Sequence, residues 1–404
     1  MELAARASVE PDLNQISAVK NISFGVSPAG PRPVLDVFAE PFSQVVTDDE
    51  TVIGIAAAFP PEPTVPGGAK VPTSGVTSVG VSPAHRRRGA LRLMMERPLT
   101  EMREGGFCLA VLSATETTIY ERFGYGAVSL IAVVRIDTRR AEVRGESIGG
   151  TFELVDSETA ASVLAQIHDA QRSRIHGMVS RPSRLRERIL DDDPTDRDGP
   201  SALFHVVYRN ARGTADGYVS YRVRANWKPT GSEHTAEVLE LRGASPEVEV
   251  ELWRFLVALD LTAGVEAEVS VDNPLRECLF DTRAIATTAV TDQVWVRLLD
   301  LPAALEQRTY DHDGAVVLNV RDDMFAANTG SCLLEVIDGA AKVRPVSEDA
   351  PAGVDAISAD VSAFGALYLG GVKASTLGLA RRLEGAVESA DALFVTATFC
   401  GVEF

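Results

Sequence analysis

The apolar positions at the start of the chain predict a helix followed by strands. Residues 1–20 are expected to form a helix, because apolar side chains recur there at helical spacing. Residues 34–40, 43–46 and 51–59 are short, largely apolar runs that predict strands. The acidic tripeptide at 48–50 predicts a hairpin turn between the last two of them.

The alternation of strands and helices continues to residue 136. Residues 76–81 predict a strand, and the apolar positions that follow recur at helical spacing until Gly105. A continuous apolar run at 107–112 is typical of a strand that is covered on both faces. A short helix over 115–120 and a strand over 128–136 complete the pattern. This part of the chain therefore predicts an α/β layer with a mixed sheet.

A second pattern begins after a polar, glycine-containing stretch at 139–150, which is the expected first domain boundary. Helices are expected over 160–174 and 246–260, and strands over 203–208, 217–224 and 236–242. A strand followed by a helix repeats the outline of the first part, so we expect domains over 1–145 and 146–290.

The last third differs because its strands come before most of its helices. Strands are expected over 294–299, 315–320, 331–338, 342–346 and 393–400, and helices over 302–308 and 375–384. Asp338 and Gly339 predict the turn of a hairpin. This layout predicts an α+β domain over 291–404.

Composition and charge limit the function. The 404 residues are 45% hydrophobic and 24% charged, which is typical of a soluble globular protein with two or three domains. The net charge of −18 argues against nucleic acid as a partner and fits either a cationic substrate or simple solubility. We see no membrane span or signal-peptide core in the sequence and therefore expect a cytoplasmic protein without a membrane partner.

The cysteine and histidine residues predict neither a metal site nor a covalent mechanism. Four cysteines are scattered without metal-ligand spacing, and the six histidines form no local cluster. The sequence shows no Ser-His-Asp or Cys-His arrangement either, so any group transfer is expected to be direct.

The first candidate for chemistry is the basic turn Arg86-Arg-Arg-Gly89, between the strand at 76–81 and the helix after it. The first N–H groups of a helix have no partner within it, and the helix dipole adds positive charge there. Glycine allows a close backbone approach, and Arg86, Arg87 and Arg88 would complement a diphosphate. The alternative is a basic helix start that only contacts solvent. The spacing Arg-x-x-Gly in this setting looks like the acetyl-coenzyme-A pyrophosphate loop of GNAT acetyltransferases.

The second candidate is Tyr120, within the segment Thr118-Ile-Tyr-Glu-Arg-Phe-Gly-Tyr-Gly126. In GNAT enzymes, a tyrosine in a similar stretch lies near the coenzyme sulfur. A phenol with a pKa of about 10 can donate a proton to a departing thiolate, whose conjugate acid has a pKa of about 8.5. The alternative is that Tyr120 fills the core, which is the interpretation we favour for Phe123 and Tyr125.

The whole chain resembles the Eis acetyltransferases of actinobacteria. The segments that carry the resemblance are Val81-Ser-Pro-Ala-His-Arg-Arg-Arg-Gly89, Ile119-Tyr-Glu-Arg-Phe-Gly-Tyr-Gly126, Leu301-Pro-Ala-Ala-Leu-Glu306, Leu367-Tyr-Leu-Gly-Gly371 and the ending Glu403-Phe404. The resemblance implies two GNAT-like domains, the second without the coenzyme loop, and then a sterol-carrier-protein-like domain. It also implies a homohexamer that acetylates aminoglycosides at several amines.

The resemblance also implies the roles of individual residues. Tyr120 would be the general acid, and the terminal carboxylate of Phe404 would be the base or its relay. The residues expected at the coenzyme are Val79, Val81, Arg86, Arg87, Arg88, Gly89, Ala90, Leu91 and Thr115. Leu91 departs from the pattern, since many GNAT proteins have glycine or alanine there. Phe24 and Glu403 are the expected acceptor-binding residues, and Asp36 or Glu40 could add further negative charge.

These observations predict an N-acetyltransferase that uses acetyl-CoA as co-substrate and needs no metal. Its acceptor is expected to be a polycationic small molecule, such as an aminoglycoside or a polyamine, or a lysine side chain. The alternative is an inactive binding protein with a vestigial coenzyme site and a lipid-carrying C-terminal domain. The sequence does not identify the natural acceptor.

Overall fold

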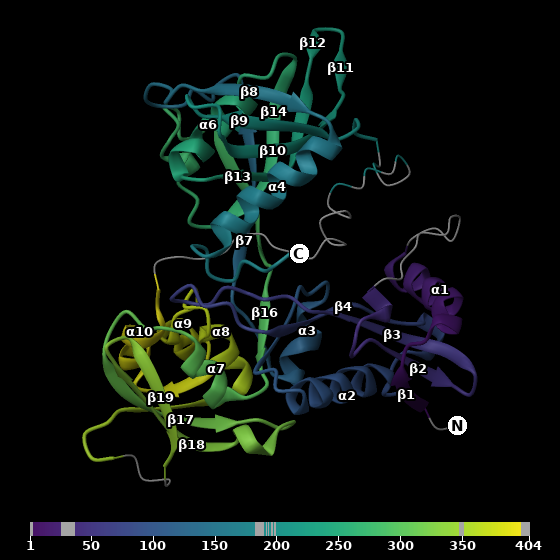
Figure 1. Cartoon of the computed structure of the whole chain (residues 1–404), viewed down its shortest axis with the longest axis vertical. Helices are drawn as coiled ribbons and strands as arrows, with labels where there is room; N and C mark the ends of the chain where they lie inside the picture. The colour runs from purple at the N-terminus through teal and green to yellow at the C-terminus, as the bar shows by residue number, and fades with distance from the viewer. Residues whose placement is uncertain are drawn as a thin grey trace. The chain divides into compact units, whose positions relative to one another are not determined.

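The computed structural model describes residues 3–25, 37–181, 190, 192, 194, 197, 199–346 and 351–396. These residues form two compact units (Figure 1). The first combines the described residues of Met1–Ser129 with those of Asp292–Phe399, and the second contains those of Leu130–Thr291. The chain therefore leaves the first unit and later returns to it. None of the helices in the described ranges is long and apolar enough to cross a membrane.

The N-terminal part of the first unit is a mixed seven-stranded sheet. Its strands, in spatial order, are β1 (Leu3–Ala7), β2 (Gln44–Asp48), β3 (Thr51–Phe59), β4 (Thr73–Val81), β5 (Leu109–Leu112), β16 (Trp295–Leu298) and β6 (Tyr125–Ala127). Strands β4 and β5 are parallel, and every other neighbouring pair is antiparallel. The mixed α/β sheet that the sequence predicts is therefore confirmed.

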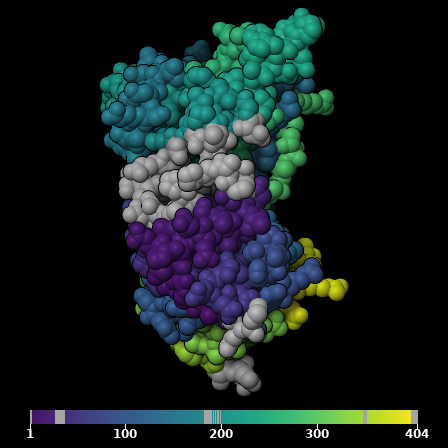
Figure 2. Space-filling view, turned by 90° about the vertical axis from the view of Figure 1, so that its right-hand side faces the viewer, coloured from purple at the N-terminus to yellow at the C-terminus, as the bar shows by residue number. Residues whose placement is uncertain are grey.

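Two long helices cover opposite faces of this sheet. They are α1 (Leu13–Phe24) and α2 (Ala90–Glu104), and the short α3 (Thr117–Tyr120) follows β5. Ile55 of β3 packs in one cluster with Ile16 of α1, whereas the next residue, Ala56, packs in another with Met94 of α2. Since side chains alternate between the two faces of a strand, the two helices lie on opposite sides. The N-terminal segment that includes α1 also forms outer surface (purple in Figure 2).

Strand β16 joins this sheet only after the chain has completed the second unit. It pairs with β5 on one side and with β6 on the other, so that Arg297 lies opposite both Ala110 and Tyr125. The apolar run at 294–299 predicts the strand itself. Its place inside the first sheet depends on partners about 170 residues earlier in the chain, which local patterning does not reveal.

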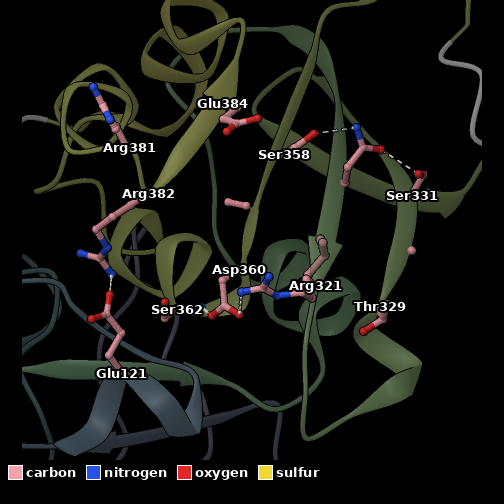
Figure 3. Close-up of a pocket in the computed structure, with 14 residues that line it drawn as sticks. Glu121, Arg321, Thr329, Ser331, Ser358, Asp360, Ser362, Arg381, Arg382 and Glu384 are labelled. Carbon is pink, nitrogen blue, oxygen red and sulfur yellow. Dashed lines mark hydrogen bonds and ion pairs between the residues drawn. The ribbon is translucent and has the colours of Figure 1, made fainter. Parts of the chain in front are cut away.

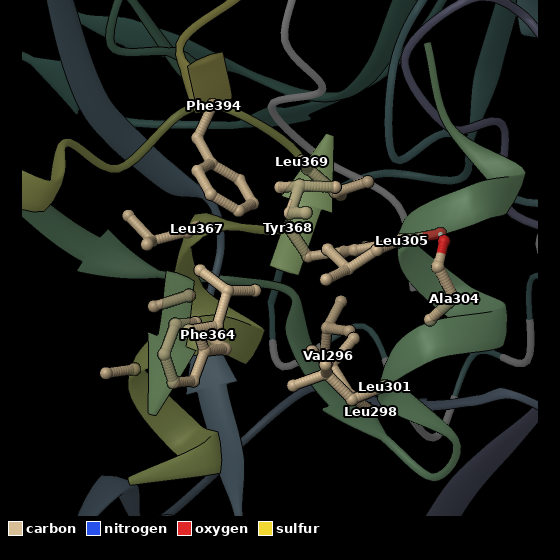
Figure 4. Close-up of a cluster of buried hydrophobic side chains, with 14 of the residues drawn as sticks. Val296, Leu298, Leu301, Ala304, Leu305, Phe364, Leu367, Tyr368, Leu369 and Phe394 are labelled. Atoms are coloured by element: carbon tan, nitrogen blue, oxygen red, sulfur yellow. Dashed lines mark hydrogen bonds between the residues drawn. The ribbon is translucent and has the colours of Figure 1, made fainter. Parts of the chain in front are cut away.

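The C-terminal part of the first unit is a five-stranded sheet with four helices. The strands, in spatial order, are β19 (Ala340–Pro345), β18 (Gly330–Ile337), β17 (Gly314–Arg321), β20 (Ala356–Asp360) and β21 (Leu383–Gly385). The helices are α7 (Leu301–Gln307), α8 (Val361–Leu367), α9 (Ala374–Leu379) and α10 (Val387–Phe394). Figure 4 shows Phe364, Phe394 and Leu305, from three of these helices, in one apolar cluster. The same cluster includes Leu109 and Val111 of β5, so it continues into the N-terminal sheet.

Two glycines allow α8 to pack directly on the first sheet. A Cβ atom added to Gly126 of β6 would lie 2.1 Å from the Ser362 carbonyl oxygen and 2.3 Å from the Ala366 nitrogen. A Cβ atom added to Gly365 would lie 2.5 Å from the Val296 carbonyl oxygen. Backbone therefore meets backbone at this junction, and only glycine fits.

The second unit contains another mixed seven-stranded sheet. Its strands, in spatial order, are β15 (Ile285–Asp292), β7 (Leu130–Asp137), β14 (Thr262–Ser270), β13 (His234–Gly243), β10 (Ala215–Arg224), β9 (Phe204–Arg209) and β8 (Thr151–Val155). Helices α4 (Ser157–Arg172) and α6 (Pro246–Val257) pack against it, and Trp227–Lys228 (β11) with Gly231–Ser232 (β12) forms a small separate hairpin. The strand–helix repetition that the sequence predicts is thus present.

The structure places the change of unit at a different point from the expected boundary. Strand β7 pairs with β14 along its length, with Ile136 opposite Val265. The second unit therefore begins at Leu130 and not near residue 145. The polar stretch at 139–150 lies within this unit, since Arg254 donates hydrogen bonds to the carbonyl oxygens of Val143 and Arg144.

Several local expectations also need correction. The first residues form β1 and not a helix, because they pair with β2. The strand expected over 393–400 begins in helix α10, whose last residue is Phe394, and its residues 397–400 lie outside the described ranges. The helix expected over 375–384 already ends at Leu379, because Arg381 adopts a left-handed conformation (φ 58°) and the chain turns into β21.

The glycine junction generates a first prediction. Gly126→Ala should lower the free energy of unfolding by about 1–3 kcal/mol or more, because the new methyl group overlaps the backbone of α8. Gly264→Ala in β14 is the matched control, since its new Cβ atom would lie no closer than 3.6 Å to any neighbour. Urea denaturation measures both. Equal stability of the two variants would contradict the proposed close contact.

Candidate active site

Strands β4 and β5 run side by side for a short distance only. They pair from Thr73 opposite Leu109 to Gly75 opposite Val111. Beyond that point β4 continues to Val81 but β5 does not pair with it, and a bulge in β4 near Ser78 (φ 51°) changes its direction. The second half of β4 therefore has no described strand along its β5 side, which leaves backbone groups available to a ligand.

The chain turns sharply from the end of β4 into helix α2. Arg87 (φ 64°) and Gly89 (φ 92°) both have left-handed backbone conformations, and α2 begins at Ala90. No side chain caps this helix, and the N–H groups of Gly89, Ala90 and Leu91 have no hydrogen-bond partner among the described residues. These free donors, together with the helix dipole, can bind an anionic group.

The three arginines of this turn differ in their surroundings. Arg86 and Arg87 are exposed and make no ion pair within the described part of the chain. The Arg88 guanidinium lies 3.3 Å from the Asp48 carboxylate of β2. Arg86 and Arg87 are therefore the arginines whose charge is free for a phosphate, whereas the charge of Arg88 is partly balanced.

Other residues expected at the coenzyme lie at the same edge of the sheet. Val79 and Val81 are half-buried on the half of β4 that does not pair with β5. Thr115 is exposed in the connection between β5 and α3. Since β4 and β5 are parallel neighbours, the segments that follow their carboxyl ends meet at one edge.

Tyr120 is the last residue of α3, and its side chain is buried except for 6% of its surface. Its ring contacts the Tyr125 ring edge-on, with 6.1 Å between the centroids. The Tyr120 hydroxyl has no hydrogen-bond partner among the described residues, yet it is not fully enclosed as the Tyr125 hydroxyl is. Burial, together with the nearby Glu116 carboxylate, raises the pKa of Tyr120. The phenol therefore stays protonated at neutral pH and can donate a proton.

A buried ion pair supports the turn that follows Tyr120. The Arg297 guanidinium of β16 donates to both carboxylate oxygens of Asp322 at 2.8 Å, and Arg297 is fully buried. A Cβ atom added to Gly124 would lie 2.7 Å from the same guanidinium. Asp322 also accepts hydrogen bonds from the backbone of Met324 and Phe325. This pair links the C-terminal domain to the turn that carries Tyr125.

The expected acceptor-binding residues are mostly not placed. Phe24 is exposed at the end of α1, where Gly25 ends the helix in a left-handed conformation. Glu40 is half-buried and has an interaction partner. Asp36, Glu403 and the catalytic candidate Phe404 lie outside the described residues. Within the described ranges, no group of three or more His, Cys, Asp or Glu side chains could hold a metal ion.

Comparisons with known proteins identify the family. Residues 5–128 and 177–298 each match the family described as an acetyltransferase (GNAT) domain, and residues 301–400 match the sterol carrier protein domain. An uncharacterized N-acetyltransferase of Streptomyces coelicolor is 37% identical over 83% of this chain and 80% of its own length. The N-acetyltransferase Eis of Mycobacterium tuberculosis is 33% identical over 82% of this chain and 79% of its own length.

The solved structures agree with the sequence comparison. The crystal structure of Eis1 from Mycobacterium abscessus superimposes with a TM-score of 0.84 and 31% identity, covering 100% of both chains. The chain belongs to the Eis family of GNAT N-acetyltransferases. A GCN5-related N-acetyltransferase from Anabaena variabilis shares the fold at 18% identity and a TM-score of 0.82. The protein is therefore an acetyltransferase enzyme with two GNAT domains and a sterol-carrier-protein-like domain, as the sequence predicts.

Sequence analysis missed the buried residues that support the turn after Tyr120. Arg297 is a lone cation inside the apolar run 294–299, and this is the one local signal that could have indicated a buried charge. Its partner Asp322 lies in a polar segment, where an acidic residue gives no sign that it is buried. Gly124 and Gly126 were part of a recognised motif, but only the structure shows which atoms they approach.

The buried pair generates a second prediction. Asp322→Ala should lower the free energy of unfolding by about 3–5 kcal/mol, because it leaves the Arg297 charge buried without a counterion. Asp323→Ala is the control, since that side chain is 85% exposed, and it should change the stability by about 0.5 kcal/mol or less. Urea denaturation measures both variants.

The double variant Arg297→Met/Asp322→Leu tests whether the loss of stability comes from the unpaired buried charge or from the loss of side-chain packing. It should recover most of the stability that Asp322→Ala loses, because two apolar side chains of similar size replace the pair. If Asp322→Ala proved as stable as Asp323→Ala, the ion pair would not be what holds this turn.

Proposed function

We propose that this enzyme transfers the acetyl group of acetyl-CoA directly to a primary amine of a polycationic acceptor, such as an aminoglycoside or a lysine side chain. The proposal rests on one observation. The turn before α2 follows β4, and Tyr120 follows β5, which is the parallel neighbour of β4. At this edge, N–H groups and two arginines that have no partner among the described residues suit a diphosphate. A protonated phenol at the same edge suits a departing thiolate.

In the proposed step the amine nitrogen attacks the thioester carbonyl carbon, and a C–N bond replaces the C–S bond. The departing sulfur takes a proton, for which Tyr120 is the proposed donor. The amine loses a proton to solvent or to a nearby base. The phenol needs no help to stay protonated, because burial raises its pKa above the ordinary value. General acid catalysis of this kind contributes about 10²–10⁴-fold to the rate.

A direct transfer is favoured over a covalent intermediate because the described cysteines are poor nucleophiles. Burial raises the pKa of the Cys108 and Cys332 thiols to about 11. The pKa of Cys278 is also raised by burial. A thiol that stays protonated at neutral pH is a weak nucleophile.

The proposed acceptor rests on charge and on the resemblance to Eis enzymes. The net charge of −18 favours a cationic acceptor. We further propose that the terminal carboxylate of Phe404, with Glu403 and Phe24, attracts and orients the amine. A free terminal carboxyl group has a pKa of about 3.5, so orientation or a water-mediated relay suits it better than direct proton abstraction. A cytoplasmic homohexamer is likewise proposed from the resemblance alone.

The alternative of an inactive lipid-binding protein has less support. The apolar interior of the C-terminal domain is occupied by its own side chains, including Phe364, Tyr368 and Phe394, each fully buried (Figure 4). A thiol-release assay with acetyl-CoA tests the proposal against aminoglycosides, spermidine and lysine peptides. Thiol release with at least one of these amines is expected. Release with none of them would reject the proposed acceptor class.

The proposed role of Tyr120 as proton donor generates a third prediction. Tyr120→Phe should lower kcat by about 10²–10⁴-fold while leaving the affinity for acetyl-CoA nearly unchanged. Since the folded-state pKa of Tyr120 is raised, wild-type kcat should fall only when the pH rises above the ordinary phenol value near 10. The variant should lack this alkaline fall. Steady-state kinetics against pH and calorimetry with acetyl-CoA are the measurements.

Tyr125→Phe is the matched control for this test. The Tyr125 hydroxyl is fully enclosed and has no hydrogen-bond partner among the described residues, so its removal should leave kcat unchanged and stability equal or higher. If Tyr120→Phe retained wild-type turnover, Tyr120 would not be the acid.

The basic turn generates a fourth prediction. Arg86→Ala/Arg87→Ala should weaken acetyl-CoA binding by about 10–100-fold, because charge-assisted hydrogen bonds to the diphosphate are lost. Arg92→Ala is the control, since Arg92 is 73% exposed and pairs with Glu96 on the same helix. Calorimetry at two salt concentrations measures the affinity. A double variant that binds as tightly as the control would exclude these arginines from the coenzyme site.

A further inference from the structure

The C-terminal domain contains a cavity that the proposed acetyl transfer does not use. It has a volume of about 730 Å³, which lies in the range of small-ligand sites. Figure 3 shows it over one end of the five-stranded sheet, with side chains of β17, β18 and β20 on its floor. Apart from Val320, Ala359 and Gly330, every residue that lines it is polar or charged.

Four polar residues form a row across four adjacent strands. Ser331 of β18 lies opposite Asn319 of β17, which lies opposite Ser358 of β20, which lies opposite Glu384 of β21. Side chains directly opposite one another in a sheet have Cβ atoms about 4.5–5.5 Å apart. The register of the sheet therefore places four hydrogen-bonding groups side by side on one floor.

The hydrogen bonds along this row leave a defined pair of free groups at its end. Ser331 Oγ donates to Asn319 Oδ1 at 2.7 Å, and Asn319 Nδ2 donates to Ser358 Oγ at 3.1 Å (Figure 3). Ser358 Oγ is therefore used as an acceptor, and its own proton remains available. Among the described residues, neither that hydroxyl proton nor the Glu384 carboxylate has a partner.

The charged residues around the row are mostly balanced. Arg321 lies 3.5 Å from the Asp360 carboxylate, and Arg382 lies 2.6 Å from the Glu121 carboxylate. Figure 3 shows the Arg381 guanidinium pointing away from Glu384. The lining carries three arginines and three carboxylates, so the cavity has no net charge and no strong preference for an anion or for a cation.

A free donor next to a free carboxylate is matched in full by a group that accepts and donates at once. A hydroxyl does both, whereas an ammonium group only donates and a carboxylate only accepts. We propose that this cavity binds a neutral polyhydroxylated ligand, a saccharide, with one of its hydroxyls between Ser358 and Glu384. Asn319 holds the Ser358 hydroxyl in place, and further ligand hydroxyls contact the polar rim. This site is independent of the proposed acetyl transfer.

Saturation-transfer-difference NMR on the full-length protein tests the site, with trehalose and maltotriose as probes. At least one saccharide should show transfer signals and half-saturate at or below roughly 10 mM, since a few exposed hydrogen bonds give weak binding. Glu384→Gln should raise the half-saturating concentration by about tenfold or more, because a bond to a charged acceptor is replaced by a weaker one. Ser358→Ala should do the same.

Glu335→Gln is the matched control, because Glu335 is an exposed carboxylate of β18 outside the cavity. This variant should bind the probe as the wild type does, and acetyl transfer should be unchanged in all three variants. Absence of signal with both saccharides would overturn the proposal. Equal binding by the wild type and Glu384→Gln would overturn it as well, even if acetyl transfer itself were shown.

Discussion

The insertion of β16 between β5 and β6 is the constraint on which the first GNAT sheet depends. Both neighbouring strands are short, and each uses β16 as its hydrogen-bonding partner. Because β16 also carries Arg297, the strand brings a buried positive charge into the sheet, and the C-terminal domain supplies its counterion, Asp322. The acetyltransferase sheet and the sterol-carrier-protein-like domain therefore form one structural unit. Their packing at Gly126 and Gly365, where backbone contacts backbone, leads to the same conclusion.

This arrangement gives the C-terminal domain a role in positioning the candidate acid. Tyr120 contacts Tyr125 through an edge-on ring contact, and Tyr125 lies opposite Arg297 on the neighbouring strand. A fully buried ion pair is a costly way to hold a turn, since both charges must leave water. It nevertheless ties β16 to the C-terminal domain, since Arg297 lies on this strand and Asp322 directly follows β17. The domain thus helps to fix the turn between Tyr120 and Tyr125.

Local sequence patterns predicted most of the helices and strands. The features that they missed depend on pairing between segments far apart in the chain. The strand at β4, the helix at α2 and the basic turn between them follow from periodicity, glycine and charge, which act over a few residues. The partners of β16 and the start of the second unit at β7 depend on registers that no local pattern carries. At the C-terminal end, Leu393 and Phe394 begin the run that predicts a strand, yet they belong to α10. A short apolar run is compatible with either element.

The candidate site also contains residues that a local pattern indicates and residues that only the fold brings together. The arginine turn and Tyr120 could be predicted because their chemistry is local, whereas Arg297 and Asp322 become partners only in the folded sheet. The row from Ser331 to Glu384 likewise exists only through strand register, since its members are spread over four segments of ordinary polar sequence.

The late arrival of β16 has a consequence for synthesis on the ribosome. Roughly 170 residues separate Ala127 from Trp295, and translation at about 5–20 residues per second needs roughly 10–30 s to make them. During this interval the nascent N-terminal sheet has the edges of β5 and β6 exposed, and the second GNAT domain can complete its own sheet first. The first sheet can therefore be completed only after the whole second GNAT domain has been synthesised.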